Sequence, residues 1–153
     1  MKRDIVIKFG SCILISFVLF AGCAINKNSS ASDNLSSVTV MPPLEGHWKA
    51  FEVKGEPVTV ASDHEPYLQF IPDSKRVAGF SGCNRVMGGT KEENDKFSFV
   101  GMAVTRMACI SPFAELEDQF LAALNSTVAR RMNNNILELL DKNGKVVARF
   151  KME

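Results

Sequence analysis

The sequence predicts a mostly β domain of the α+β class, built from an antiparallel sheet and one packed helix. Short apolar runs recur about every 8–12 residues and are separated by Gly, Pro, Asn and Asp, a spacing typical of antiparallel strands. The dipeptide Asn143-Gly144 lies between two such runs and is a strong hairpin signal. One segment, from Pro112 to about Asn125, instead repeats its apolar residues at helical spacing.

The expected strands are short runs of apolar and β-branched residues bounded by turn-forming residues. They are His47 to Val53, Tyr67 to Ile71, Arg76 to Phe80, Val86 to Thr90, Lys96 to Val100, Ile136 to Leu140 and Lys145 to Phe150. Polar connections between consecutive runs, such as Pro72 to Lys75 and Glu92 to Asp95, predict turns and hairpins.

The expected helix begins at Ser111-Pro112, because a hydroxyl can cap the first turn and Pro suits the first helical position. Its apolar residues form a stripe that we expect to pack on the sheet: Phe113, Leu116, Phe120, Leu121 and Leu124.

The N-terminus resembles a bacterial lipoprotein signal. Basic residues precede a mostly apolar stretch from Phe9 to Ala21, which is too short to cross the roughly 30 Å hydrocarbon core of a bilayer. The following Ala21-Gly22-Cys23 resembles a lipobox, so residues 1–22 are expected to be a signal peptide and Cys23 the lipidation site, carrying palmitate-type acyl chains. The alternatives are an ordinary secretory signal with a chance cysteine and, after it, an uncleaved membrane anchor. By the same resemblance, Ala24 after the cysteine implies the outer membrane, with the domain facing the periplasm.

Residues 23–43 are expected to be a flexible tether, because Ser- and Asn-rich sequence buries too little apolar surface to fold. The folded domain then occupies residues 44–153. A net charge of +1 gives no field that would gather nucleic acid. Nothing in the sequence demands more than a monomer.

Two cysteines belong to the expected domain, Cys83 and Cys109. An exported protein meets an oxidising compartment, which favours a structural disulfide; closing a loop of about 27 residues would stabilise the fold by about 3–4 kcal/mol. Two buried thiols are the main alternative, followed by a metal site or a redox pair. The lone His47 and His64 do not have zinc-ligand spacing, so we expect no metal.

Three short motifs carry a resemblance to a known family. They are Gly46-His47-Trp48, the run from Gly79 to Asn84, and the run from Thr105 to Cys109. In this order they resemble the META domain of heat-shock HslJ-like proteins, and the likeness covers residues 44–150. The resemblance implies an antiparallel sheet curled into a partial barrel with one helix against it. It also implies a bacterial envelope protein linked to stress, with no established catalysis and no cofactor.

The polar residues of these motifs are the candidate site residues: Gly82, Asn84, Thr105 and Arg106. Asn84 is expected to bond backbone at a turn. Arg106 is expected either to be buried against a carboxylate or carbonyl, or to present a small anion site. The acidic pairs Glu92-Glu93 and Glu117-Asp118 are interpreted as solvated. We find no nucleophile with a positioned base, so no enzyme is expected.

The leading functional hypothesis is a membrane-anchored, non-catalytic binding module for envelope integrity or stress. Its partner would be an envelope protein, or an apolar or anionic small ligand in the barrel mouth. One alternative is an inhibitor of a lytic enzyme, a protease or lysozyme, acting through an insertable loop at Lys91 to Lys96. A further alternative is a thiol-disulfide exchange protein, which would require an exposed cysteine with a depressed pKa.

Overall fold

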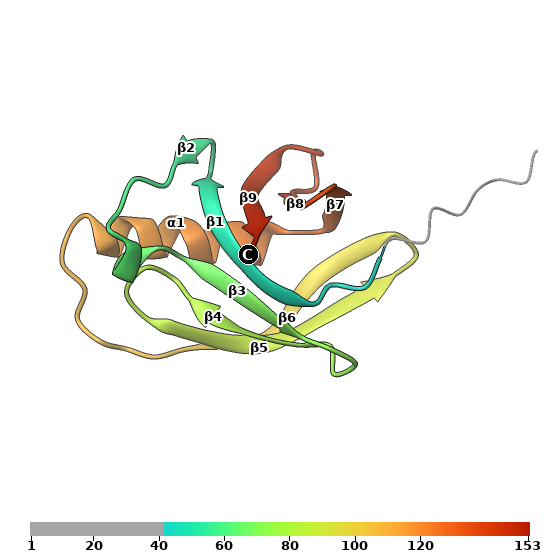
Figure 1. Ribbon diagram of the computed structural model, residues 1–153, viewed down its shortest axis with the longest axis horizontal. Helices are drawn as coiled ribbons and strands as arrows, with labels where there is room; N and C mark the ends of the chain where they lie inside the picture. Colours follow the sequence, from blue (N-terminus) through green and yellow to red (C-terminus); the bar gives the residue numbers. More distant parts are fainter. Residues whose placement is uncertain (1–41) are drawn as a thin grey trace, which may run out of the picture. The chain divides into compact units, whose positions relative to one another are not determined.

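The computed structural model describes residues 42–153, and the predicted signal peptide, the predicted lipidation site Cys23 and the predicted tether up to residue 41 lie outside the described residues. One nine-stranded antiparallel sheet and one α-helix make up this part of the chain (Figure 1). The strands are β1 (Gly46–Val53), β2 (Glu56–Pro57), β3 (Tyr67–Ile71), β4 (Arg76–Phe80), β5 (Arg85–Glu93), β6 (Lys96–Val104), β7 (Ala129–Asn133), β8 (Ile136–Leu140) and β9 (Val146–Met152). The helix α1 spans Phe113–Ser126, and a short 3-10 turn spans Ser62–His64.

The sheet order is β6-β5-β4-β3-β1-β9-β8-β7, with β2 paired only to β1. β1 therefore lies between the β3–β6 half and the β7–β9 half, and the sheet curls around the helix into a half-barrel (Figure 1). The Phe97 backbone N–H donates to the Val128 carbonyl at 3.0 Å, which links the two ends of the curled sheet. The partial barrel with one packed helix is confirmed.

The expected strand positions agree with the structure, with two kinds of difference. β5 is longer than expected because it continues to the tight turn at Asn94-Asp95, where both residues have positive φ. β6 is longer because it continues past Val100 to Val104, where it pairs with the start of β5. β2 and β7 were not expected, since the polar sequence of β7 does not read as a strand. The helix is shifted by one residue, with Pro112 at its N-cap and without the expected hydroxyl cap on the backbone.

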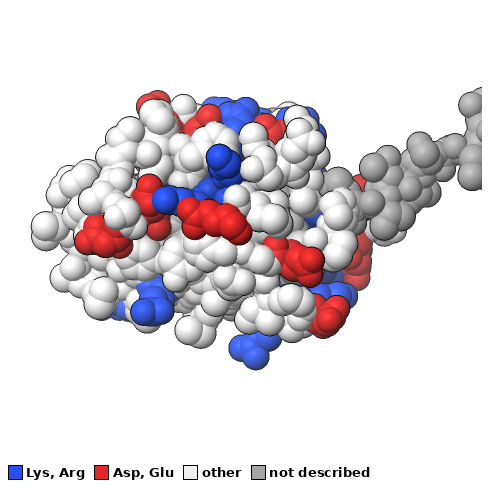
Figure 2. Space-filling model, in the orientation of Figure 1, with Lys and Arg blue, Asp and Glu red and all other residues white. Residues whose placement is uncertain are grey.

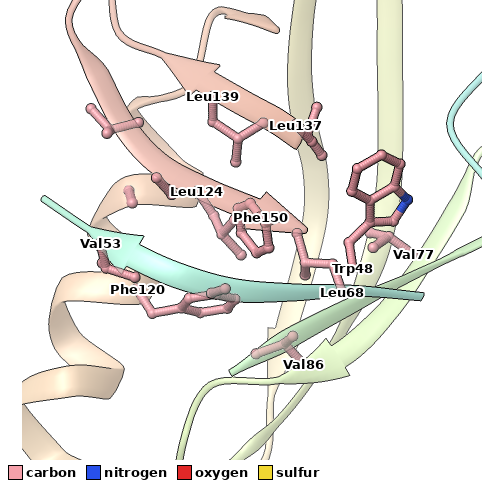
Figure 3. Packing of buried hydrophobic residues seen from close by; sticks show 14 of the residues in the cluster. Trp48, Val53, Leu68, Val77, Val86, Phe120, Leu124, Leu137, Leu139 and Phe150 are labelled. Atoms are coloured by element: carbon pink, nitrogen blue, oxygen red, sulfur yellow. The ribbon is translucent and has the colours of Figure 1, made fainter. Parts of the chain in front are cut away.

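A single apolar core fills the space between the sheet and α1 (Figure 3). The helix contributes Phe120, Ala123 and Leu124, and the Phe120 ring meets Phe150 of β9 edge-on at 6.1 Å. Trp48 of β1 is fully buried, and its indole N–H donates to the Glu45 carbonyl at 2.8 Å. Burying each such side chain contributes about 1.5–3 kcal/mol, so this core is the main stabilising element of the domain.

Arg130 of β7 is a buried charge that sequence analysis did not single out. Its guanidinium donates to both carboxylate oxygens of Glu92 on β5, at 2.8 and 2.9 Å, and to the Pro42 carbonyl at 2.9 Å. It also lies 5.7 Å from the centre of the Phe97 ring. Glu92 is exposed, in agreement with its interpretation as solvated, but its carboxylate also holds a buried arginine that was not expected.

Within residues 42–153, α1 is too short and too polar to cross a membrane. On the face shown in Figure 2, acidic and basic side chains are interspersed rather than gathered by sign.

Candidate functional site

A polar network under the disulfide fixes one corner of the half-barrel. The turn Ser81–Asn84 joins β4 to β5, and the Ser81 N–H donates to the Asn84 carbonyl at 2.9 Å. Both residues are buried, with 0% and 2% of their surface exposed. The Asn84 N–H donates to Glu117 Oε2 at 2.9 Å, and the Ser81 hydroxyl contacts the same oxygen. The turn is thereby bound to α1.

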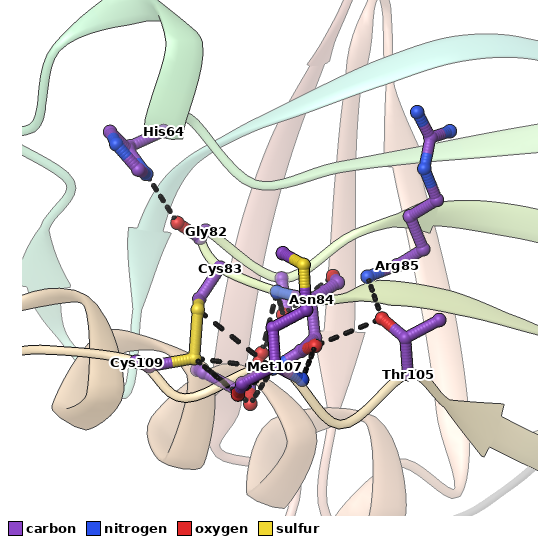
Figure 4. The surroundings of a disulfide bond; sticks show 10 residues. His64, Gly82, Cys83, Asn84, Arg85, Thr105, Met107 and Cys109 are labelled. Carbon is purple, nitrogen blue, oxygen red and sulfur yellow. Dashed lines mark hydrogen bonds between the residues drawn. A yellow bond between two sulfur atoms is a disulfide. The ribbon is translucent and has the colours of Figure 1, made fainter.

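The Asn84 side chain connects three segments (Figure 4). Its amide nitrogen donates to Glu117 Oε1 at 3.0 Å and to the Met107 carbonyl at 3.3 Å. Its oxygen accepts from the Thr105 hydroxyl at 2.9 Å and from the Met107 N–H at 2.8 Å. Asn84 thus bonds backbone, as expected, but across to the segment that follows β6 rather than only within its own turn.

The disulfide Cys83–Cys109 closes this corner, with Cα atoms 6.0 Å apart. It joins the β4–β5 turn to the segment before α1, and this is the pairing that the sequence favours. The two sulfur atoms and a Glu117 carboxylate oxygen lie within 4.8 Å of one another, a grouping that could hold a metal. The ligand form of cysteine is the thiolate, however, and here the sulfurs are bonded to each other.

Two charged residues, Arg106 and Glu117, differ from expectation in their burial and their partners. Arg106 is exposed, and its side chain has no hydrogen bond or ion pair within the described chain, so the expectation that it is buried is wrong. Its role as a small anion site stays a prediction. Glu117, interpreted as a solvated helix residue, is half-buried and accepts three hydrogen bonds from Ser81 and Asn84.

The outer face of the sheet, opposite the core, carries apolar side chains in two cross-strand rows. Pairing places Tyr67, Phe80 and Arg85 side by side on β3, β4 and β5. A second row runs through Gln69, Ala78, Met87 and Ala103. Met87 is 52% exposed, which is unusual for a large apolar residue in a sheet and marks this face as a candidate interaction surface.

Two hollows lie on this face, and we call them together the outer groove. The larger, of 490 Å³, is lined by Tyr67, Phe80, Arg85, Met107 and the disulfide residue Cys83, with Asp63 and Thr105 at its rim. The smaller, of 310 Å³, shares Tyr67 and Arg85 with it and extends past Ala78 and Met87 to His47. Figure 4 shows the Arg85 side chain extending away from the Asn84 network.

The interior of the half-barrel offers less room. The core side chains fill it, and the hollow at its open end, between Leu44, Phe70 and Phe97, has a volume of 250 Å³. The groove on the outer face was not expected from the sequence. The signal for it was the set of residues that alternate with the core positions, because these include the large apolar residues Tyr67, Phe80 and Met87.

The segment Lys91 to Lys96 is not a loop. It is the tip of the β5–β6 hairpin, in which Glu92 pairs with Phe97 and Glu93 with Lys96. Arg130 holds the Glu92 side chain, so this tip is a braced ribbon.

The fold and the corner network define a disulfide-braced β half-barrel with one helix. The chain belongs to the META domain family, which matches residues 41–153. Heat shock protein HslJ of Escherichia coli (strain K12) is 34% identical to it over 97 residues, covering 62% of this chain and 61% of that protein. The chain thus spans less than two thirds of the length of that relative.

Solved structures share the fold. An NMR structure of a protein from Burkholderia xenovorans has 27% identity and a TM-score of 0.54, covering 71% of this chain and 82% of the other. A crystal structure of a DUF4847 family protein from Bacteroides vulgatus has a TM-score of 0.51, covering 71% of this chain and 93% of the other. At 16% identity, this second likeness concerns the fold alone.

Proposed function

We propose that this protein is a lipid-anchored, non-catalytic interaction module of the bacterial cell envelope that contributes to stress tolerance. The lipobox-like sequence ending at Cys23 supports the anchor, and the periplasmic face of the outer membrane is its proposed location. The name of the heat shock relative supports the link to stress.

A non-catalytic role is supported by how the polar groups of the corner are used. The contact between the Ser81 hydroxyl and Glu117 resembles a nucleophile with its base, but Ser81 has no exposed surface that a substrate could reach. The Asn84 amide is saturated by hydrogen bonds within the domain. These residues therefore stabilise the corner rather than act on a ligand.

The observation that carries the proposal is the exposed apolar outer groove on a rigid sheet. Its floor consists of paired strands, and its wall is fixed by the disulfide and the Asn84 network. A surface that needs little ordering on binding loses less conformational entropy, which favours recognition of another protein. The partner is an envelope protein that covers Met87 and its neighbours.

The interaction is tested with a photo-crosslinking amino acid placed at Met87 in the full chain, in envelopes of cells shifted to high temperature. The matched control is Val128, an apolar residue that directly precedes β7 and has comparable exposure, 41% against 52% for Met87. A discrete adduct from Met87 and none from Val128 is expected. Equal adducts from both positions, or none from either, would contradict the proposal.

The anchor is tested separately by metabolic labelling with an alkynyl fatty acid. The wild-type chain should incorporate the label and remain with membranes. Cys23→Ser should abolish both, because Cys23 is the residue to which the acyl chains of a lipobox are attached. Label that persists in Cys23→Ser would refute lipid anchoring through Cys23, and the proposed protein interaction would be unaffected by that result.

A further inference from the structure

We infer that the outer groove binds an extended peptide segment in which an acidic side chain lies between two apolar ones. This inference rests on the proposed function, since it names the partner chemistry of the same surface. The argument uses the length of the groove, its two hollows and the arginine that lines both.

The groove has the length of a short extended peptide. Its smaller hollow alone runs across the sheet from His47 on β1 to Met87 on β5, past the neighbouring strands β3 and β4, and the larger hollow lies beside it on the adjacent row of side chains. Three spacings of about 4.8 Å give a span of roughly 14 Å across the strands. An extended chain covers about 3.3 Å per residue, so four or five residues fit.

The two hollows suit two apolar side chains. Tyr67 and Phe80 form an aromatic floor in the larger hollow, with ring centres 6.3 Å apart, and Met107 closes it with 64% of its surface exposed. In the smaller hollow the floor is low because Ala78 is a small residue between Gln69 and Met87. Both hollows accept aliphatic or aromatic groups.

Arg85 lines both hollows and supplies a positive charge; Asp63, the acidic residue of the larger hollow, makes no ion pair with it. The Arg85 side chain makes no ion pair or hydrogen bond with any other residue between 42 and 153. At the β1 end of the groove the polar side chains instead have partners, because Lys49 contacts Glu65 and His47 Nδ1 lies 3.2 Å from a Glu153 carboxylate oxygen. The Lys49 pKa is raised by its hydrogen bond to Glu65, so this lysine stays charged and already has an acidic partner.

A carboxylate on the ligand is therefore the partner that Arg85 lacks, and arginine binds carboxylates through two parallel hydrogen bonds. In an extended peptide, alternate side chains point to the same side about 6.6 Å apart. The pattern apolar–acid–apolar at alternate positions places the acid over Arg85 and the apolar groups over the hollows. An acyl amphiphile has one apolar body beside its charge and would leave one hollow empty.

The test uses two fluorescein-labelled peptides, Leu-Thr-Glu-Thr-Leu and Leu-Thr-Lys-Thr-Leu, with blocked ends. Binding is followed by fluorescence anisotropy with the full lipidated chain in phosphatidylcholine nanodiscs. Wild type should bind the Glu peptide at least tenfold more tightly than the Lys peptide. Arg85→Glu should reverse the preference, because like charges then repel the Glu peptide.

The matched control is Arg76→Glu, which makes the same charge change on an exposed arginine of β4 that does not line the groove. It should leave the preference unaltered. Ala78→Phe fills the smaller hollow and should weaken both peptides by at least fivefold. Fluorescence of Trp48 confirms that each variant is folded, since this tryptophan is fully buried.

Several outcomes would overturn the inference. They are an unchanged preference in Arg85→Glu, an equal reversal in Arg76→Glu, the absence of binding by both peptides at 1 mM, and displacement of the Glu peptide by equimolar dodecanoate. Any of these, combined with a specific Met87 crosslink, would reject the peptide chemistry while leaving the proposed function in place. Loss of the crosslink as well would reject both.

Discussion

Replacement of Asn84 by Asp tests whether the buried amide is what holds the corner together. The two side chains have the same shape, but the Asp variant replaces the amide donor with an oxygen. In the wild type that donor faces the Met107 carbonyl at 3.3 Å and Glu117 Oε1 at 3.0 Å. Leaving a buried polar group unsatisfied costs about 1–3 kcal/mol, and more when it is charged. We expect Asn84→Asp to lower the free energy of unfolding by about 4 kcal/mol at pH 7.

The pH dependence of this variant has a defined sign. Burial and the neighbouring Glu117 carboxylate raise the pKa of the introduced carboxyl in the folded state. The folded state then binds a proton more tightly than the unfolded state, so the stability deficit relative to wild type shrinks as the pH falls from 7 to 5. Urea unfolding followed by the fluorescence of Trp48, the sole tryptophan, measures both effects.

Thr105→Val is the control, because it leaves the Asn84 amide intact and removes only an exposed hydroxyl, which donates to Asn84 Oδ1 and accepts from the Arg85 N–H. It should cost only about 1 kcal/mol at either pH. If Asn84→Asp were no more costly than this control, or equally costly at pH 7 and pH 5, the view of Asn84 as the central donor of the corner would be refuted.

Three further predictions concern stability. Replacing Cys83 and Cys109 by Ala should lower the free energy of unfolding by about 3–4 kcal/mol, as measured by urea unfolding without reductant; an unchanged value would show that the link does not restrain the unfolded chain. Glu92→Ala should lower the free energy of unfolding by about 3 kcal/mol and Arg130→Met by only about 1–2 kcal/mol. The reason is that Arg130 is buried, with 2% of its side chain exposed, whereas Glu92 can be hydrated. Thermal unfolding of the two variants side by side measures the difference, and the reverse order would contradict this reasoning. The pKa of Glu138 is lowered by its hydrogen bonds to Arg149 and Arg131. Its contribution to the free energy of unfolding is therefore present above about pH 4.3 and is lost as the pH falls through the lowered pKa. Glu138→Gln should flatten this part of the acid-unfolding curve, and a curve identical to that of the wild type would refute this contribution.

The sequence predicts those parts of the fold that depend on local pattern. Alternation identified β3, β4 and β8 at their observed bounds, and apolar spacing placed α1 to within one residue. β7 was missed because Ala129–Asn133 is mostly polar, and its strand character comes from pairing with β8 and from burying Arg130 against Glu92.

The candidate site depends on contacts that no local pattern contains. The motifs drew attention to Asn84 and the cysteines, but the main side-chain partner of Asn84 is Glu117, which lies 33 positions further along the chain. The outer groove arises because β3, β4 and β5 align Tyr67, Phe80 and Arg85 in one register. A register between strands and the curvature of a sheet are properties of the assembled fold.

The position of β1 within the sheet has a mechanical consequence. The strand that follows the N-terminal segment is an interior strand, hydrogen-bonded to β3 on one side and β9 on the other. Tension applied to the chain ahead of Pro42 is met first by the Arg130 bond to the Pro42 carbonyl. Beyond that bond, β1 could leave the sheet only by breaking its hydrogen bonds to both neighbouring strands, so a pull from the N-terminal side would load an interior strand rather than peel away an edge.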